Sequence, residues 1–286
     1  MREVKKYDKL WENHINILEM NRQEDTMKTI GFIGMGNMAG AIAAGIIQKD
    51  LMKKEEVFAY APHYDKLVAN AEKIGFTPCR ELKELVAKTD TLVMACKPYQ
   101  IEGVLSEIKE ELKGKALISI AAGWNYDKYQ EFLDESTRLQ FIMPNTPAMV
   151  GEGVLLFEEK NSLLEEERAE VKKLFEALGI VIELPVHLMG IGGALTGCGP
   201  AFIDLIIEAL GDAGVKYGVP RKQAYEMVSQ MILGSAKLQL ETGEHPGVLK
   251  DNVCSPAGTT ICGVDALEHA GIRAGFIDAI DAIMNK

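Results

Sequence analysis

The sequence lacks the cysteine and histidine patterns of disulfide-rich and metal-binding proteins. Its five cysteines are odd in number, widely separated and free of any C-x-x-C pair, whereas a disulfide framework needs paired cysteines and a zinc site needs closely spaced ligands. The five histidines show no metal-ligand spacing either. We therefore expect no metal site, and unpaired cysteines are typical of the reducing cytoplasm, where we expect the protein to be.

Signatures of several enzyme and partner classes are also missing. The chain has no G-x-S-x-G, H-E-x-x-H or G-x-x-x-x-G-K-[ST] motif, which disfavours hydrolases, metalloproteases and P-loop proteins. Lys and Arg number 31 against 42 Asp and Glu, a net charge of -11, which repels nucleic acids and anionic membranes. The longest uncharged stretch, about 187–203, is interrupted by five glycines and Pro200. We therefore expect no membrane-spanning helix, and neither nucleic acid nor a membrane as a partner.

The chain does contain an alternation of strand and helix patterns over residues 28–184. Strands are expected at 28–34, 56–61, 91–95, 116–122, 138–144, 153–157 and 179–184, with helices at about 37–49, 64–74 and 163–178. Strands that alternate with helices form βαβ units around a parallel sheet. We therefore assign residues 27–185 to an α/β domain with a parallel sheet.

Two segments lie outside this alternation. Residues 186–286 show only helical patterns, with one helix from Pro200 and another at about 221–241. Their small and apolar residues exceed what one helical layer can bury, which predicts an all-α domain that forms a homodimer. Residues 1–26 are polar and precede Met27. We interpret them as a disordered or loosely docked extension, or as the product of an upstream start codon. The alternative is an interface helix carrying Trp11, Ile15 and Leu18.

A glycine-rich turn, Gly34-Met35-Gly36-Asn37-Met38-Ala39, follows the first expected strand and opens a helix. In such a turn the first glycine permits the sharp bend, the second lets the backbone approach a pyrophosphate, and a small third residue allows close packing. The helix N-terminus faces the negative charge. This context predicts a Rossmann-type dinucleotide site at Gly34, Gly36, Asn37 and Met38. A turn that serves only packing is the alternative.

The end of the second strand bears on the choice of cofactor. An acidic residue there would bind the ribose hydroxyls of NAD, but the chain has no acid until Asp65. This absence favours NADP. His63, Lys66 and Arg80 are candidate neighbours of its 2'-phosphate, and solvated surface residues are the alternative for each.

Three further strand ends supply candidate cofactor residues, because ligands of open α/β sheets bind at the carboxyl ends of the strands. They are the turns Ala95–Pro98, Ser119–Gly123 and Met143–Pro147, the last with an Asn-Thr pair between two prolines. The candidates in these turns are Ala95, Lys97, Pro98, Ala121, Ala122 and Asn145. Ordinary strand-ending turns are the alternative for the first two.

The helical half contains two loops rich in glycine and hydroxyl groups. Residues Thr196–Ala201 are expected to lead into a helix N-terminus, and Ser255–Thr260 resembles an anion-binding nest ahead of another helix. Such a nest suits a carboxylate. Helix caps with flexible glycines are the alternative.

Taken in order, these motifs resemble those of the pyrroline-5-carboxylate reductases. The matching segments are Gly31–Met38, Lys97-Pro98, Ser119–Gly123, Met143–Ala148 with Val150-Gly151, Thr196–Phe202, Glu208–Gly214 and His245–Thr260. The resemblance implies a Rossmann domain that holds NADPH, or NADH, followed by a helical dimerisation domain, with dimers that can assemble into a decamer. It implies reduction of L-1-pyrroline-5-carboxylate to L-proline. A related imine or β-hydroxyacid reductase and a non-catalytic nucleotide sensor are the alternatives.

The resemblance also implies roles for single residues. Ser255, Gly258, Thr259 and Thr260 would bind the substrate carboxylate. Thr260 would also be the catalytic hydrogen-bond donor to the ring nitrogen, with an oriented water as the alternative donor. Asn37, Lys97, Ala122 and Asn145 would lie along the cofactor.

The chain departs from the family pattern in three places. Thr196–Pro200 replaces Ser-Gly-Ser-Gly-Pro, and Pro256-Ala257-Gly258 replaces Pro-Gly-Gly. Ala61-Pro62 replaces the polar pair, often Ser or Asn followed by Arg, that comes after the second strand. The third departure leaves Arg80 as the candidate substitute contact for the 2'-phosphate.

Overall fold

The computed structural model describes residues 27–286, so the expectations for residues 1–26 lie outside the described part of the chain. The chain divides into two compact units, the first ending at Met189 and the second running from Gly190 to Lys286. The boundary near residue 186 stays a prediction.

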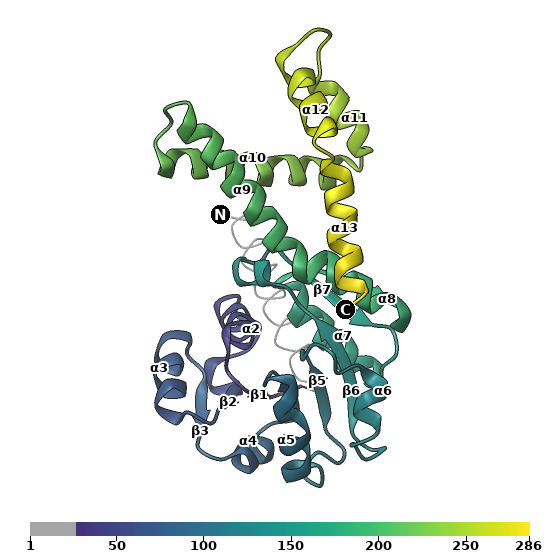
Figure 1. Cartoon of the computed structure of the whole chain (residues 1–286). Coiled ribbons are helices and arrows are strands. Elements are labelled where there is room, and N and C mark those ends of the chain that lie inside the picture. The colour runs from purple at the N-terminus through teal and green to yellow at the C-terminus, as the bar shows by residue number, and fades with distance from the viewer. Residues whose placement is uncertain (1–26) are drawn as a thin grey trace, which may run out of the picture. The chain divides into compact units, whose positions relative to one another are not determined.

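An eight-stranded sheet forms the centre of the first unit (Figure 1). Its strands are β1 (Ile30–Ile33), β2 (Val57–Tyr60), β3 (Thr77–Cys79), β4 (Thr91–Met94), β5 (Ala116–Ser119), β6 (Arg138–Met143), β7 (Gly153–Glu158) and β8 (Gly179–Leu184). They lie in the order β3-β2-β1-β4-β5-β6-β7-β8. The first six pair in parallel, which confirms the Rossmann-type α/β prediction.

The sheet differs from the expected all-parallel arrangement at one edge. β7 pairs antiparallel to β6, and β8 pairs parallel to β7. The connection from β6 to β7 contains only a 3₁₀ turn, Thr146–Val150. A parallel pair would need a longer crossover, so the short connection reverses the chain direction.

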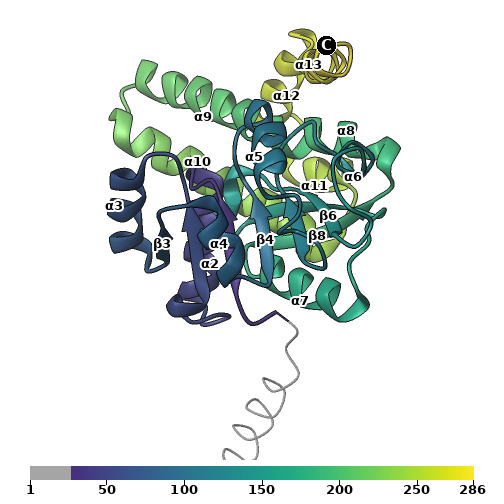
Figure 2. The same ribbon diagram turned by 90° about the horizontal axis from the view of Figure 1, so that it is seen from below.

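Helices cover both faces of this sheet (Figures 1 and 2). They are α2 (Asn37–Gln48), α3 (Tyr64–Ile74), α4 (Leu82–Lys88), α5 (Ile101–Ile108), α6 (Tyr126–Gln130) and α7 (Glu165–Glu176). Side chains of α2, α3 and α7 join one apolar core, and those of α4, α5 and α6 join a second core. The two cores hold the strands from both sides, so the strand ends have fixed positions within the unit.

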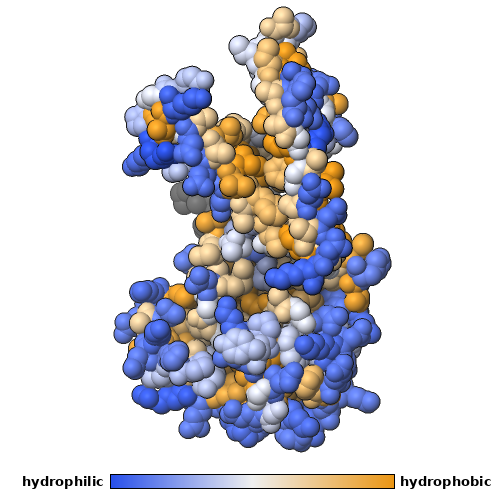
Figure 3. Space-filling view, viewed as in Figure 1, coloured by the Kyte–Doolittle hydropathy of each residue, from blue (hydrophilic) through white to orange (hydrophobic). Residues whose placement is uncertain are grey.

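The second unit is helical, as expected, and buries few side chains within one chain. After α8 (Val186–Gly193) it contains α9 (Gly199–Lys216), α10 (Arg221–Thr242), α11 (Pro246–Val253), α12 (Thr259–His269) and α13 (Ile272–Met284). Within residues 190–286, Ala194 and Ala224 are the only buried side chains. Hydrophobic residues are widely exposed on the face in Figure 3. The helices therefore need another surface to cover them.

The break expected at the glycines and Pro200 is absent. α8 continues through a π-helical turn, Ala194–Cys198, into α9. Pro200 comes directly after this wider turn, where its ring and missing N–H are accommodated. In the described part of the chain, the resulting run Val186–Lys216 is the one helix long and apolar enough to span a membrane by length and composition.

A buried carboxyl group lies at the end of β7. Glu158 is fully buried, and its Oε2 accepts a hydrogen bond from the backbone N–H of Tyr126 at 2.9 Å. Its Oε1 has no hydrogen-bond partner among the described residues. Burial raises the pKa of this carboxyl group, and nearby Asp127 acts in the same direction. Folding therefore shifts this carboxyl group toward its protonated form relative to an exposed glutamate.

Glu158→Gln is expected to stabilise the protein increasingly as the pH rises. Because the pKa of Glu158 is higher in the folded state than in the unfolded state, wild-type stability falls as the pH increases from the ordinary carboxyl range through the raised pKa. Glutamine keeps an acceptor for the Tyr126 N–H and carries no charge. The Tm of the variant should exceed that of the wild type by more at about pH 8 than at about pH 5. At the higher pH, the free energy of unfolding should increase on the order of 1 kcal/mol. An equal difference at both pH values would contradict this prediction.

Candidate functional site

The turn after β1 requires glycine at its first position. Gly34 has a φ of 98°, and its N–H donates to the carbonyl oxygen of Tyr60 at 2.8 Å. A Cβ here would lie 2.8 Å from the backbone nitrogen of Cys96 and 2.9 Å from the carbonyl carbon of Ala95. The turn can therefore lie this close to the residues that follow β4 only when position 34 has no side chain.

Gly36 faces open space instead. It has a φ of −82°, and a Cβ at this position would meet nothing within 4 Å. Gly36 is the N-cap residue of α2, and no side chain caps the helix. The first N–H groups of α2 therefore lack an intrahelical acceptor next to an unfilled space. This arrangement fits a phosphate group of a dinucleotide.

The other predicted cofactor residues of the first unit gather at the same edge. β1, β4, β5 and β6 are neighbours in the sheet and run in parallel, so the turns after them lie side by side. Residues Asn37, Lys97, Pro98 and Ala122 are exposed, Met38 and Ala95 are half-buried, and Ala121 and Asn145 are buried. Burial raises the pKa of the Cys96 thiol to about 11, so this thiol is uncharged at neutral pH.

Asn145 is turned toward the protein rather than toward solvent. Its Oδ1 accepts a hydrogen bond from the N–H of Val154 at 2.9 Å, and its backbone carbonyl accepts from Ala148 at 3.2 Å. Its side chain therefore ties the turn after β6 to β7. Any contact with a cofactor would have to coexist with these bonds.

Arg80 lies beside the end of β2, where the resemblance requires a substitute phosphate contact. It follows β3, which pairs with β2, and its guanidinium carbon lies 4.1 Å from the centroid of the Tyr64 ring. Its backbone N–H donates to Glu84 Oε2 at 2.9 Å. The side chain is exposed. The stacking contact holds a positive charge near the start of α3, which His63 precedes as the N-cap residue.

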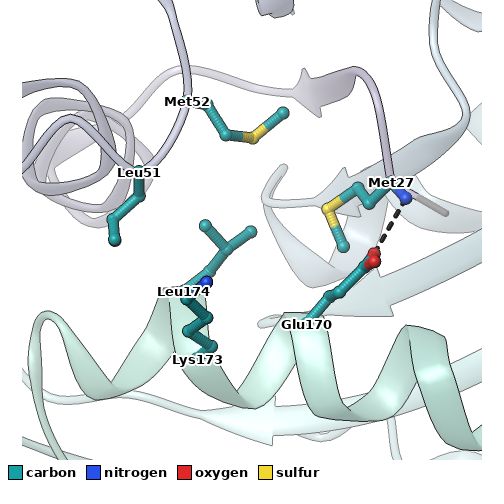
Figure 4. A pocket seen from close by; sticks show the side chains of 6 residues that line it. All are labelled: Met27, Leu51, Met52, Glu170, Lys173 and Leu174. Atoms are coloured by element: carbon teal, nitrogen blue, oxygen red, sulfur yellow. Dashed lines mark hydrogen bonds between the residues drawn. The ribbon is translucent and has the colours of Figure 1, made fainter. Parts of the chain in front are cut away.

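A small pocket, drawn in Figure 4, has none of the predicted cofactor residues in its lining. Its lining residues are Met27, Leu51, Met52, Glu170, Lys173 and Leu174. The backbone N–H of Met27 donates to Glu170 Oε2 at 2.8 Å. Met27 precedes β1, so this pocket lies toward the amino ends of the strands. Its volume of about 50 Å³ is too small for a dinucleotide.

The Ser255–Thr260 loop presents its hydroxyl groups to solvent. Ser255, Thr259 and Thr260 are exposed, and within residues 27–286 their hydroxyls make no hydrogen bond to protein. The N–H of Gly258 donates to the Ser255 carbonyl at 2.9 Å, and α12 begins at Thr259 without a side-chain cap. The loop thus combines free hydroxyls with the unpaired N–H groups of a helix N-terminus. That combination suits a carboxylate.

Ala257 shows that the replacement in this loop is not conformationally neutral. Its φ is 57°, in the left-handed region that glycine adopts without strain. An alanine there costs about 1 kcal/mol.

The other predicted loop, Thr196–Ala201, does not provide a free helix N-terminus, because it lies within the continuous helical run. The Thr196 hydroxyl donates to the Gly192 carbonyl at 2.9 Å.

The cysteine, histidine and acidic side chains within residues 27–286 show neither disulfide nor metal-site geometry. All five cysteines are free thiols. Within residues 27–286, no group of three or more His, Cys, Asp or Glu side chains could hold a metal ion.

Comparison with known proteins gives matches to both units of the chain. A family model for pyrroline-5-carboxylate reductase dimerisation matches residues 187–286, and a model described as NADP oxidoreductase, coenzyme F420-dependent, matches residues 29–123. The pyrroline-5-carboxylate reductase of Treponema pallidum is 37% identical over 261 residues, which cover 90% of this chain and 99% of the relative. The Escherichia coli enzyme of the same name is 39% identical over 264 residues, covering 91% and 97%.

A solved structure gives the same result at the level of the fold. Plasmodium falciparum pyrroline carboxylate reductase with NADP bound aligns with a TM-score of 0.82 at 34% identity, covering 91% of this chain and 96% of that one. Relatives above 30% identity over most of both chains confirm the resemblance inferred from the motifs. The chain therefore belongs to the pyrroline-5-carboxylate reductase family of NAD(P)H-dependent oxidoreductases.

Proposed function

We propose that this protein reduces L-1-pyrroline-5-carboxylate to L-proline with NAD(P)H. The observation that carries the proposal is the Ser255–Thr260 loop, whose exposed hydroxyls lie around the uncapped N-terminus of α12. A nucleotide sensor would not need this loop. The test is the loss of NADPH absorbance when the purified protein is mixed with pyrroline-5-carboxylate. The absence of oxidation with either NADPH or NADH would count against the proposal.

The reaction requires little general acid–base catalysis from side chains of the protein. A cyclic imine is protonated readily near neutral pH, and bound NAD(P)H supplies the hydride that adds to the imine carbon. The C=N bond becomes CH–NH, so the main requirements are orientation and a hydrogen bond at nitrogen. In this proposal the Thr260 hydroxyl donates to the lone pair that forms on nitrogen as the hydride adds to the imine carbon. Ser255, Gly258 and Thr259 hold the carboxylate.

The cofactor contacts are proposed along the carboxyl edge of the sheet. The proposed residues are Gly34, Gly36, Asn37, Met38, Ala95, Lys97, Pro98, Ala121, Ala122 and Asn145, with Arg80 at the 2'-phosphate. The open space at Gly36 supports a pyrophosphate there. Asn145 would act through the turn that it fixes, because its Oδ1 already binds Val154.

Arg80→Ala is expected to raise the KM for NADPH roughly 10-fold while leaving the KM for NADH unchanged. One hydrogen-bonded ion pair with a phosphate accounts for a loss of this size. Steady-state kinetics with both cofactors measure it. Arg80→Lys is the matched variant, because it keeps the charge and loses the planar stacking on Tyr64. An unchanged KM for NADPH in Arg80→Ala would remove Arg80 from the site.

We also propose a homodimer, formed by residues 186–286, that can assemble further into a decamer in the cytoplasm. The dimerisation model over residues 187–286 and the exposed apolar helices support the dimer. Dimer formation would cover the apolar run Val186–Lys216 without a membrane. In this division of the chain into two domains, residues 27–185 form the cofactor domain. Light scattering of the purified protein should give a mass of two chains or a multiple of it. A monomer at micromolar concentration would contradict the proposal.

A further inference from the structure

The turn Ser119–Gly123 is braced from inside the first unit by a tyrosine. The Ser119 hydroxyl donates to Tyr129 Oη at 2.9 Å, and the N–H of Ala121 donates to Ser119 Oγ at 3.3 Å. Ser119 and Tyr129 are fully buried, and Ala121 is 4% exposed. A continuous hydrogen-bond chain therefore links the backbone of the turn to α6.

Tyr129 is itself held firmly. Its ring lies 4.9 Å from that of Trp124, which in turn packs against Phe132 at 5.3 Å. The short helix α6 is fixed at its start, where the Asn125 side chain accepts from the N–H of Lys128 at 3.1 Å and Glu158 accepts from the N–H of Tyr126 at 2.9 Å. Burial raises the pKa of the Tyr129 hydroxyl, so this group stays neutral and acts only as a hydrogen-bonding group.

The turn that Tyr129 braces is open on its other side. Ala122 and Gly123 are exposed, and Gly123 has a φ of 78°. The N–H of Trp124 donates to the Ala121 carbonyl at 3.2 Å, which closes the turn. The turn is thus supported on its buried side by Ser119 and Tyr129, and is open to solvent at Ala122 and Gly123.

We propose that the nicotinamide ring rests against the Ala121–Ala122 backbone, and that Tyr129 is a positioning residue that holds this backbone in place through Ser119. The inference depends on the proposed cofactor contacts of Ala121 and Ala122. A misplacement of about 1 Å between reacting atoms can lower the rate about 100-fold. Loss of the Tyr129 hydroxyl would therefore slow the chemical step more than it weakens binding.

Tyr129→Phe tests the inference because it removes one oxygen and keeps the aromatic packing. We expect kcat to fall about 5- to 10-fold, with both KM values changed by less than about 2-fold. The primary isotope effect with NADPH deuterated at the transferred position should increase, since hydride transfer becomes slower. Ser119→Ala should lower kcat by a similar factor. The double variant should have a kcat no lower than that of either single variant, because all three variants lose the same hydrogen-bond chain.

Tyr126→Phe is the matched control. It removes a hydroxyl from the same helix, and the Tyr126 hydroxyl makes no hydrogen bond among the described residues, so kcat and the isotope effect should not change. A wild-type kcat and isotope effect in Tyr129→Phe, or losses that simply add in the double variant, would overturn the inference and leave the proposed function intact. If the wild-type protein fails to oxidise NADPH with pyrroline-5-carboxylate, the proposed function falls and this inference falls with it.

Discussion

Replacing Thr260 with alanine is expected to lower kcat about 100-fold, the usual cost of removing one hydrogen bond to a reacting atom. Thr260 lies in the first turn of α12, and its hydroxyl is exposed and makes no hydrogen bond to the described protein. Its removal should therefore leave the fold intact. Steady-state kinetics with pyrroline-5-carboxylate and NADPH, together with an unchanged Tm, measure the effect.

Thr260→Ser is the matched control, because serine keeps a hydroxyl at the same position. It should retain most of the activity. Thr259→Ala should instead raise the KM for pyrroline-5-carboxylate more than it lowers kcat, since Thr259 is proposed to bind the carboxylate in both the ground and transition states. If Thr260→Ala kept the wild-type kcat, an oriented water would be the better candidate for the donor.

The sequence predicts the long and strongly patterned elements of the first unit well. β1 and α2 follow from an apolar run, a glycine turn and a helical stripe. β3 has only three residues and includes Pro78, so its pattern is too short to detect. The reversal at β7 depends on the length of one connection rather than on any strand pattern. Local periodicity therefore identifies elements better than it identifies their direction.

The site shows a similar division. The sequence predicts the glycine turn because its backbone conformation and close packing require glycine at Gly34. The tie between Ser119 and Tyr129 has no sequence signal, because it depends on a side chain ten positions away that reaches under the turn. The continuous helix through Pro200 lacks a sequence signal for a related reason. A π-helical turn accommodates the proline, and composition alone does not reveal such a turn.

Alanine substitutions at Gly34 and Gly36 are expected to have sharply different effects. At Gly34 the positive φ and the approach of Ala95 and Cys96 leave no room for a Cβ. Gly34→Ala should therefore lower the free energy of unfolding by about 2–3 kcal/mol and disrupt cofactor binding as well. Chemical denaturation and NADPH titration measure the two effects.

Gly36→Ala should separate binding from folding. A Cβ at Gly36 meets nothing within 4 Å, and the φ of −82° is accessible to alanine. The free energy of unfolding should change by no more than about 1 kcal/mol, the cost of alanine at an N-cap position. The new methyl group would occupy the space next to the uncapped N-terminus of α2, so the KM for NADPH should rise about 10-fold or more, a loss of at least about 1.4 kcal/mol. If Gly36→Ala bound NADPH normally, the pyrophosphate would have to lie elsewhere on the carboxyl edge. Equal destabilisation by both variants would mean that Gly36 serves packing, which is the alternative that the turn sequence leaves open.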